Sequence, residues 1–478
     1  MKKFASLILT VVMLATMLTV FAVPASAEET KTAEDYLSEA AQLENAGKYD
    51  LAANAYYYAA NLYSLEIIST SAAADIYMKA GECYEKAENF ISAGDAYYYA
   101  ANLYSLEIIS TSAADAYMKA GECYEKAEDF GPAVDAFGNA VEKYKQAGDS
   151  ASAADAYMKT GECCEKAENF YPAVEAFINA ASQYLLARNR ASAADAYKKT
   201  GECYEKLESF GPAGGAFCNA AAQYNQARDS ASATDAYMKA GECYEKAGEF
   251  GPAVDAFGNA VQQYQLAGDS ASAADAYKKV GECHEKAGNF GAAGQAFGNA
   301  AGQYKQARDS ASAAEAYMKA GECYEKAESF DSAGIAFNYA AEQYNKAGDS
   351  ASATNAYKKA GDAYMKNECS DSTESFTQAG NSYWQACDYA AAANAYMKAG
   401  EYYLKTNRFS DAASNFSDAA QAARRKANES TGSTLSEGSL TIIVGVAGIA
   451  VGLVGGLLLG KKKKKPALAS GTDNTDEE

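Results

Sequence analysis

A 40-residue spacing of near-identical segments constrains the fold of this chain more than any other feature. Each segment resembles Tyr-Met-Lys-Ala-Gly-Glu-Cys-Tyr-Glu-Lys, and diverged copies open at Tyr36 and Tyr396. The regular copies begin at Tyr77, Tyr117, Tyr157, Tyr197, Tyr237, Tyr277, Tyr317 and Tyr357. Ten such units cannot form ten unrelated cores. The spacing therefore predicts an array in which stacked neighbours share a continuous core.

The first half of a unit has the periodicity of an amphipathic helix. Within residues 112–128, small and aromatic residues fall three or four positions apart, at Ala113, Ala116, Tyr117, Ala120, Tyr124 and Ala127. These steps place them on one helical face. On the polar face, Asp115 precedes Lys119 and Glu122 precedes Lys126 by four residues, which predicts ion pairs along the helix.

The second half of a unit predicts another helix. We expect the chain to break at Phe130-Gly131-Pro132 and to form a helix over residues 133–147. Gly148 then suits a left-handed C-cap, and Asp149 or Ser150 suits the next N-cap. The predicted fold class is an all-α solenoid of about ten helix hairpins, followed by one C-terminal transmembrane helix.

The N-terminus has the pattern of a targeting segment. Lys2 and Lys3 precede a nearly continuous apolar run from Phe4 to Val23, and Ala25-Ser26-Ala27 has the small residues of a cleavage site. Residues 1–27 therefore predict a signal peptide. The alternative is an uncleaved membrane anchor. Residues 28–428 are assigned to the repeat array.

The C-terminus predicts a membrane anchor. Residues 429–439 are polar and rich in Gly, Ser and Thr, which is typical of a flexible linker. Residues 440–460 are uncharged and long enough to cross a bilayer. The run Lys461–Lys465 places the short tail, residues 461–478, in the cytoplasm and the repeats outside the cell. Glycines recur every four residues in this span, at Gly448, Gly452, Gly456 and Gly460, and predict a possible homodimer contact.

The charge of the chain narrows the classes of partner. The formal net charge is −21 at pH 7 although the lysine run contributes five positive charges, so the array itself is strongly acidic. Such a field disfavours nucleic acid and anionic membrane surfaces. It is compatible with basic proteins, with cations, or simply with solubility.

The repeat motif resembles a known family. Tyr117 occupies the place of the first aromatic residue of the tetratricopeptide repeat, whose further offsets match Gly121, Tyr124, Ala133, Phe137 and Ala140. The 40-residue length and the Ala-rich segment 213–244 resemble the soluble NSF attachment proteins (SNAPs), adaptors of vesicle fusion. This resemblance implies a right-handed solenoid and a role in intracellular protein transport, which would require the array to face the cytosol.

The cysteines predict packing more than cross-linking. Seven of the eleven recur at the 40-residue spacing: Cys83, Cys123, Cys163, Cys203, Cys243, Cys283 and Cys323. Neighbouring packed helices lie about 8–10 Å apart, whereas a disulfide needs Cα atoms within about 7 Å. These residues are therefore interpreted as buried thiols. Cys369 and Cys387 form the one pair whose disulfide state stays open.

No catalytic or metal-binding constellation is evident in the sequence. His284 is the only histidine, and it replaces the tyrosine found at Tyr124 in another repeat. A zinc site needs several converging ligands, and a hydrolytic triad needs a base beside a nucleophile. We therefore predict no enzyme activity, no cofactor and no metal.

The resemblance to tetratricopeptide arrays implies that the first helix of each unit lines a partner-binding groove. Three equivalent sets of residues would line it: Asp115, Met118, Glu122 and Glu125; Asp155, Met158, Glu162 and Glu165; and Asp235, Met238, Glu242 and Glu245. Carboxylates with flexible methionines suit a basic, partly apolar peptide or helix. The alternative is a solvated face neutralised by lysines four residues away.

Two functions follow from this reading. The first is a membrane-anchored, non-catalytic scaffold that presents the solenoid outside the cell to protein partners. The second is a SNAP-like adaptor in vesicle-mediated transport and membrane fusion. The orientation of the array across the membrane distinguishes them.

Overall fold

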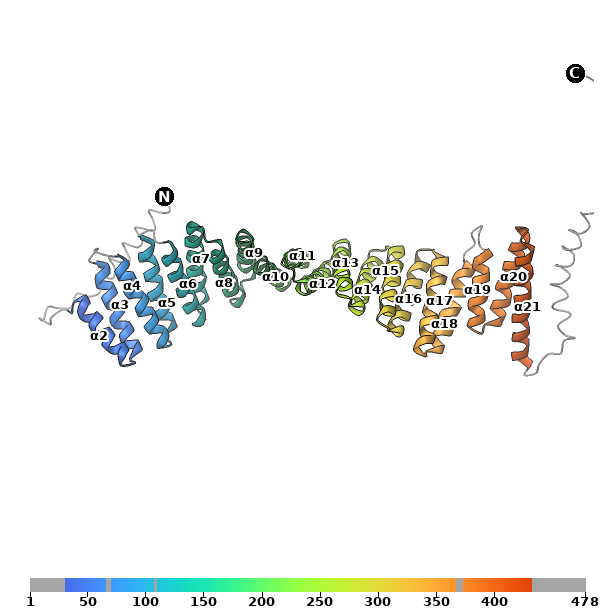
Figure 1. The fold of residues 1–478 in the computed structure, drawn as a ribbon, viewed down its shortest axis with the longest axis horizontal. Coiled ribbons are helices and arrows are strands. Elements are labelled where there is room, and N and C mark those ends of the chain that lie inside the picture. The colour runs from blue at the N-terminus through green and yellow to red at the C-terminus, as the bar shows by residue number, and fades with distance from the viewer. Residues whose placement is uncertain (1–30, 66–69, 107–109, 367–372, 432–478) are drawn as a thin grey trace, which may run out of the picture. The chain divides into compact units, whose positions relative to one another are not determined.

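The computed structural model describes residues 31–65, 70–106, 110–366 and 373–431, and within these ranges every regular element is an α-helix. The chain divides into two compact units, residues 1–189 and residues 190–478. In each unit, antiparallel helices are stacked in chain order (Figure 1). The predicted all-α array of about ten hairpins is confirmed.

The N-terminal unit contains four described hairpins. Its helices are α2 (Ala33–Asn45), α3 (Tyr49–Leu65), α4 (Thr70–Lys86), α5 (Phe90–Leu106), α6 (Ser110–Lys126), α7 (Phe130–Ala147), α8 (Ser150–Lys166) and α9 (Phe170–Leu186). Even-numbered helices are the first helices of their hairpins, and odd-numbered helices are the second.

The C-terminal unit contains six described hairpins. Its helices are α10 (Arg190–Lys206), α11 (Phe210–Gln226), α12 (Ser230–Ala247), α13 (Phe250–Ala267), α14 (Ser270–Lys286), α15 (Phe290–Gln306), α16 (Ser310–Lys326), α17 (Phe330–Ala347), α18 (Ser350–Lys366), α19 (Thr373–Gln385), α20 (Tyr389–Lys405) and α21 (Phe409–Thr431). The last helix continues three residues past residue 428, the predicted end of the array. The first helices of the hairpins in this unit are α10, α12, α14, α16, α18 and α20.

The turn inside each hairpin lies earlier than the sequence predicted. The break in the third hairpin occurs between Lys126 and Phe130, so the expected break at Phe130-Gly131-Pro132 is wrong. Glu128 takes a left-handed conformation at φ 58°, and the Asp129 amide donates to the Tyr124 carbonyl at 2.9 Å. Pro132 fits inside the first turn of α7, because amides there have no intrahelical acceptor.

The turn between hairpins follows the prediction. Gly148 ends α7 in the left-handed region, at φ 75°. Asp149 is the N-cap of α8, and its carboxylate accepts a hydrogen bond from the Ser152 amide at 3.0 Å. Charged N-caps of this kind satisfy amides that the helix leaves unpaired.

Glycine in the first helix and an aromatic ring in the second close each described hairpin from α4–α5 onward. A Cβ added at Gly121 would lie 2.5 Å from the Phe137 ring, and one at Gly161 would lie 2.6 Å from Phe177. Phe137 and Phe177 have no exposed surface. The missing side chain lets the ring lie directly against the helix backbone, so the two helices approach more closely than larger residues would permit.

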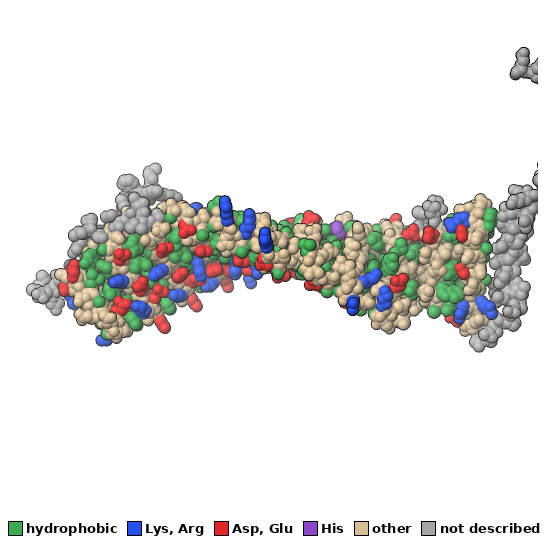
Figure 2. Space-filling view, viewed as in Figure 1, with side chains coloured by type: hydrophobic (Ala, Val, Ile, Leu, Met, Phe, Trp, Pro, Cys, Tyr) green, Lys and Arg blue, Asp and Glu red, His purple; other side chains and the backbone are tan. Residues whose placement is uncertain are grey.

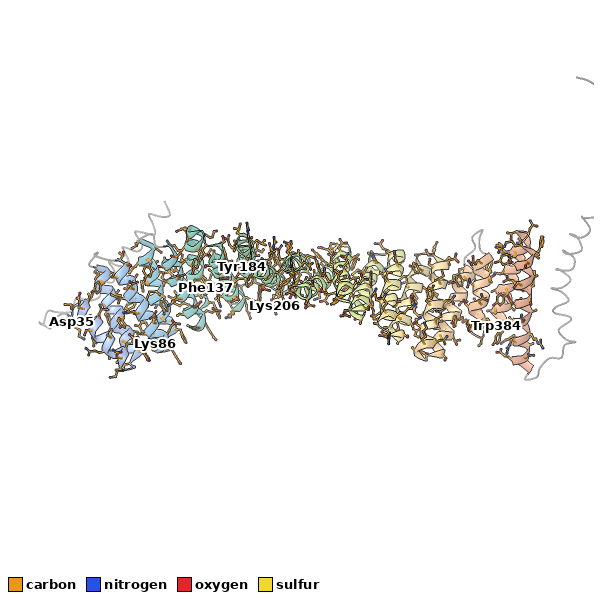
Figure 3. The ribbon with its side chains drawn as sticks, viewed as in Figure 1. Asp35, Lys86, Phe137, Tyr184, Lys206 and Trp384 are labelled. Atoms are coloured by element: carbon orange, nitrogen blue, oxygen red, sulfur yellow. The ribbon has the colours of Figure 1, made fainter. Side chains whose placement is uncertain are left out.

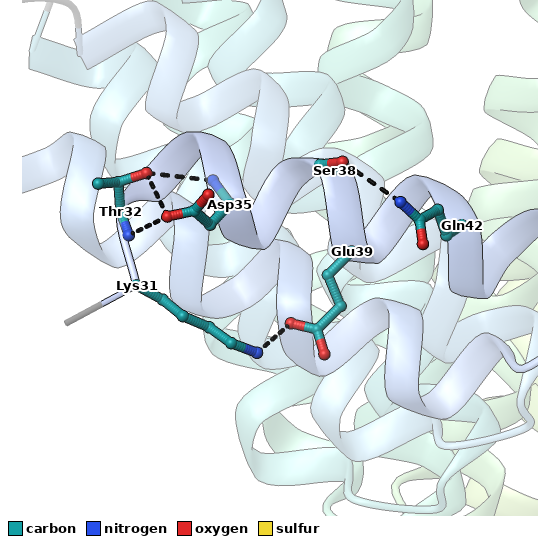
Figure 4. A network of polar contacts seen from close by, with 6 residues as sticks. All are labelled: Lys31, Thr32, Asp35, Ser38, Glu39 and Gln42. Carbon is teal, nitrogen blue, oxygen red and sulfur yellow. Dashed lines mark hydrogen bonds and ion pairs between the residues drawn. The ribbon is translucent and has the colours of Figure 1, made fainter. Parts of the chain in front are cut away.

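The first helix of the array has a polar cap (Figure 4). The Thr32 side chain accepts from the Asp35 amide at 3.2 Å, and the Asp35 carboxylate accepts from the Thr32 amide at 2.9 Å. This reciprocal pair is a capping box. An ion pair between Lys31 and Glu39, 2.8 Å long, adds to the polar surface. Polar outer faces are typical of the terminal units of repeat arrays.

The sequence-based assignments at both ends lie outside the described residues. These are the signal peptide (residues 1–27), the membrane span (440–460) with its four glycines, the lysine run and the tail (461–478). None of the helices in the described ranges is both long and apolar enough to cross a bilayer. The predictions for the ends therefore stay predictions.

The glycine–ring contact predicts a specific sensitivity to a single methyl group. We expect Gly121→Ala to lower the free energy of unfolding by about 1–3 kcal/mol, because the Phe137 ring must move to admit the new Cβ. Urea unfolding of the full-length protein, with hydrogen exchange in α6 and α7, measures the change. Gly131→Ala is the matched control, because a Cβ there meets no atom within 4 Å. Equal stability of both variants would contradict the packing account.

Candidate protein-binding surface

The first helices of successive hairpins are joined side by side by ion pairs. In the N-terminal unit, Lys126 Nζ lies 3.0 Å from a Glu85 carboxylate oxygen, which belongs to the first helix of the preceding hairpin. We call the equivalent contacts the lysine–glutamate ladder. Its other contacts are Lys86–Glu44, Lys166–Glu125, Lys246–Glu205, Lys286–Glu245, Lys326–Glu285 and Lys366–Glu325. Figure 3 shows Lys86 at the lower edge of the N-terminal unit, and Figure 2 shows acidic and basic side chains interspersed along that edge.

The ladder differs from the ion pairs predicted along each helix. Asp115–Lys119 and Glu122–Lys126 do not form ion pairs; instead Lys119 lies 3.7 Å from Glu82 and Lys126 pairs with Glu85. The lysines reach across to the neighbouring first helix because the stacked helices bring its carboxylates within range. The repeat spacing itself, which places Glu85 and Lys126 41 residues apart, contains the signal that could have revealed this.

Glu125, one of the predicted groove residues, is the most enclosed of the described ladder carboxylates. Its side chain is 13 % exposed and lies 2.7 Å from Lys166 and 3.4 Å from Lys159, both in α8. Burial alone would raise the pKa of Glu125, but the hydrogen bond from Lys166 and the charges of both lysines outweigh it and lower the pKa. Glu245 has the same arrangement with Lys286 and Lys279. Glu165 also has an interaction partner.

The predicted aspartates are held by tyrosines of the second helix. The Tyr144 hydroxyl donates to Asp115 at 2.6 Å, and Tyr184 donates to Asp155 in the same way. Burial and then the charge of Asp235 raise the pKa of Tyr264 in the corresponding hairpin. The tyrosine follows the aspartate by 29 residues, and this second regular spacing is what the sequence analysis missed. The bond fixes each carboxylate at the surface while tying the two helices together.

The remaining predicted groove residues divide into packed methionines and accessible glutamates. Met118 and Met238 are half-buried and pack against the core, and Met158 is also half-buried. Glu122 is exposed, and Glu162 and Glu242 are half-buried. Lys159 lies 3.3 Å from Glu162, and Lys239 lies 3.8 Å from Glu242, each within one helical turn. The structure thus keeps the acidic character of the surface but commits many of its carboxylates to contacts within the array.

Just over half of the chain matches one known protein family. The sequence pattern of the soluble NSF attachment protein, SNAP, matches residues 68–192 and again residues 187–314. The chain belongs to this family. A tetratricopeptide repeat pattern matches residues 297–348. The resemblance drawn from Gly121, Phe137 and residues 213–244 is therefore confirmed. No curated protein sequence matches the chain.

Several solved structures of repeat proteins align with the SNAP-family chain. BtubC from P. vanneervenii has 16 % identity over 46 % of this chain and 92 % of its own, with a TM-score of 0.29. The apo form of RapI has 13 % identity over 61 % of this chain and 98 % of its own, with a TM-score of 0.30. The TPR2AB domain of yeast Sti1, in its complex with pHSP90, has 15 % identity over 60 % of this chain and 98 % of its own, with a TM-score of 0.27. We base no functional conclusion on these low scores.

The regularly spaced cysteines of the SNAP-family array are packing residues, as predicted. All seven are buried. Burial, followed by the charge of Glu85, raises the pKa of Cys123 to about 12, so this thiol is protonated at neutral pH. Cys387 is exposed, and Cys369 lies outside the described residues, so the disulfide state of this pair stays open. Across the described ranges, no three His, Cys, Asp or Glu side chains are grouped to hold a metal ion.

The lowered pKa of Glu125 predicts a pH-dependent contribution to stability. We expect Glu125→Gln to cost about 0.5–1 kcal/mol at pH 7. A carboxyl group with a lowered folded pKa stabilises the fold fully above its ordinary value of 4.5, and this contribution is lost as the pH falls through the folded value. The free energies of unfolding of the wild type and of Glu125→Gln should therefore become equal under acid conditions.

Urea unfolding of the full-length SNAP-family protein between pH 7 and pH 3 measures this convergence. Glu122→Gln in the same helix is the control, because Glu122 is exposed and belongs to no ion pair within the described ranges. A loss for Glu125→Gln that stays constant over the whole pH range would show that the ladder is not its cause.

Proposed function

We propose that this chain is a membrane-anchored, non-catalytic scaffold that presents its repeat array outside the cell and binds other proteins. The observation that carries the proposal is the alignment of first helices by the lysine–glutamate ladder, as in Lys126–Glu85 and Lys166–Glu125. It repeats one acidic surface from hairpin to hairpin. A repeated surface suits a long peptide or helix, or several copies of one binding motif.

The position of the array rests on the sequence of the two ends. The pattern of residues 1–27 supports export, and the uncharged run 440–460 followed by five lysines supports a single anchor with a cytoplasmic tail. In this arrangement the linker 429–439 gives the array reach above the membrane. The glycines at four-residue spacing in the span would let two anchors approach closely.

Membership of the SNAP family supports a second function. A SNAP-like adaptor in vesicle-mediated transport and membrane fusion would use the same repeated surface for protein partners. In that case the array would face the cytosol. The two functions share the binding surface and differ in the side of the membrane on which it lies.

Protease treatment of intact cells tests which side the array occupies. We expect external protease to digest the repeats of the full-length protein and leave only a short fragment that reacts with an antibody against residues 461–478. The physical reason is that a sealed membrane shields only what lies behind it. Immunoblotting of treated cells, before and after lysis, measures the fragment.

Two controls make this experiment decisive. A cytosolic marker must survive until lysis, and the Lys461–Lys465 run replaced by alanines should weaken the orientation signal. Full protection of the repeats until lysis, with the marker intact, would contradict the external scaffold and favour the adaptor.

A further inference from the structure

A tyrosine in the second helix covers a tyrosine of the next first helix in the early repeats. Tyr57 packs edge-on against Tyr77 with ring centroids 5.2 Å apart, and Tyr98 packs in the same way against Tyr117, also at 5.2 Å. The Asn139 amide donates to the Tyr98 hydroxyl at 3.1 Å. The chain itself thus shows which side chain this space between helices accepts.

One repeat further on, the covering side chain is absent. Gly138 in α7 holds the position of Tyr98, and a Cβ added there would meet no atom within 4 Å. The result is a groove of about 450 Å³ between α7 and α8, which we call the Gly138 groove. Its lining residues are Gly138, Val141, Glu142, Lys145, Gln146, Tyr157 and Thr160.

The repeat places the other residues of a tyrosine site at the positions equivalent to those around Tyr98. Tyr157 stands where Tyr117 stands one repeat earlier, and it lines the groove. Asn179 in α9 holds the position of Asn139, whose amide donates to the Tyr98 hydroxyl. A guest phenol placed as the Tyr98 ring is placed one repeat earlier would have Tyr157 as its aromatic neighbour and Asn179 as its amide donor.

The charge at the rim distinguishes the open groove from the closed sites. The hydroxyls of Tyr77 and Tyr117 donate to Asn61 and Asn102, each at 2.6 Å. The equivalent residue beside Tyr157 is Glu142, which is exposed, accepts from Gln146 at 3.2 Å and forms no ion pair within the described ranges.

The basic residue at the rim, Lys145, forms no ion pair with Glu142 in the described structure. Lys145 lies over the Tyr157 ring, 6.0 Å from its centroid. The sites filled by Tyr57 and Tyr98 have a neutral asparagine amide at this position, whereas the Gly138 groove has the carboxylate of Glu142, which is in no ion pair within the described ranges. This carboxylate favours a cation next to the guest ring.

We propose that the Gly138 groove binds a tyrosine side chain of a partner protein, with a lysine or arginine beside that tyrosine in contact with Glu142. This inference rests on the proposed protein-binding function and names the chemistry of its partner. The guest would reproduce in trans the packing that Tyr98 makes in cis. Rigid aromatic anchors in preformed pockets are frequent centres of protein interfaces.

Two positions in the C-terminal unit also lack the covering tyrosine and can be compared with the Gly138 groove. Gly258 and Gly298 hold the position of Gly138, and added Cβ atoms there also meet nothing within 4 Å. The residues corresponding to Glu142 are Gln262 and Gly302, which carry no charge. A preference for a basic tyrosine peptide is therefore specific to the Gly138 groove.

Filling the groove with the chain's own side chain tests the proposal. Gly138→Tyr should fold, because Tyr98 occupies this position natively one repeat earlier, and it should close the groove. Gly131→Tyr is the matched control on the same helix: it lies in open space, and Tyr171 is the native residue at that position one repeat later. Circular dichroism and thermal melting of both full-length variants check that they fold.

The probe is a fluorescein-labelled seven-residue peptide with a central tyrosine flanked by lysines, titrated against the full-length protein in detergent at low salt. Fluorescence anisotropy measures the affinity. We expect Gly138→Tyr to weaken binding about tenfold or more, and Gly131→Tyr to change it by less than about twofold. Glu142→Gln should weaken the lysine peptide severalfold and leave a peptide with neutral flanks unchanged.

Three results would overturn the proposal: no binding of the tyrosine peptide to the wild-type protein, equal binding of the peptide with alanine in place of tyrosine, or equal affinities for Gly138→Tyr and wild type. If Gly138→Tyr failed to fold, Glu142→Gln would still decide, because it leaves the packing unchanged. Any of these results combined with external digestion of the array would refute this site and leave the scaffold function standing.

Discussion

The contact between a glycine of one helix and an aromatic ring of the next is the interaction on which this architecture depends. The contact between Gly121 and Phe137 recurs in equivalent pairs, such as Gly241–Phe257 and Gly321–Phe337. In each pair, a Cβ added to the glycine would lie 3.0 Å or less from the ring. Burying one such ring contributes about 1.5–3 kcal/mol. A second set of glycine–ring contacts joins neighbouring hairpins. At Gly94, for example, the Tyr124 ring lies against the backbone of α5.

The polar contacts contribute differently from the rings. Lys126 and Glu85 are 50 % and 30 % exposed, and exposed ion pairs contribute about 0–1 kcal/mol each. The rings therefore provide most of the stability, whereas the lysine–glutamate ladder and the Tyr144–Asp115 bonds fix the positions of surface carboxylates. An array built in this way can vary its surface, as at Gly138 and Tyr98, without disturbing the core that spaces the helices.

Sequence periodicity predicted the hairpins because burial of one helix face and the helix caps determine them. The stripe through Ala116, Tyr117 and Ala120 and the cap at Gly148 follow from rules within a single helix. The early break after Lys126 was missed because a glutamate, Glu128, takes the left-handed conformation usually held by glycine. The ladder and the Gly138 groove depend on which side chains neighbouring repeats bring together, so periodicity within one helix could not reveal them.

The residues of the predicted groove lie on the first helices, and their role in binding a partner stays a prediction. Tyr144 donates to Asp115 and Lys166 pairs with Glu125, and both partners come from other helices. The accessible features are instead the exposed Glu122 and the groove beside Glu142. Recognition would then depend on the differences between repeats more than on the motif they share.

Hydrogen–deuterium exchange of the full-length protein, resolved by mass spectrometry, tests the central claim most directly. If glycine–ring contacts close the hairpins from α4–α5 onward, amides around Gly81, Gly121 and Gly161 should exchange slowly, and amides at the turns, such as residues 127–129, should exchange fast. The same alternation should recur through α21. Fast exchange throughout the first helices, or slow exchange running unbroken across the turns, would contradict this architecture.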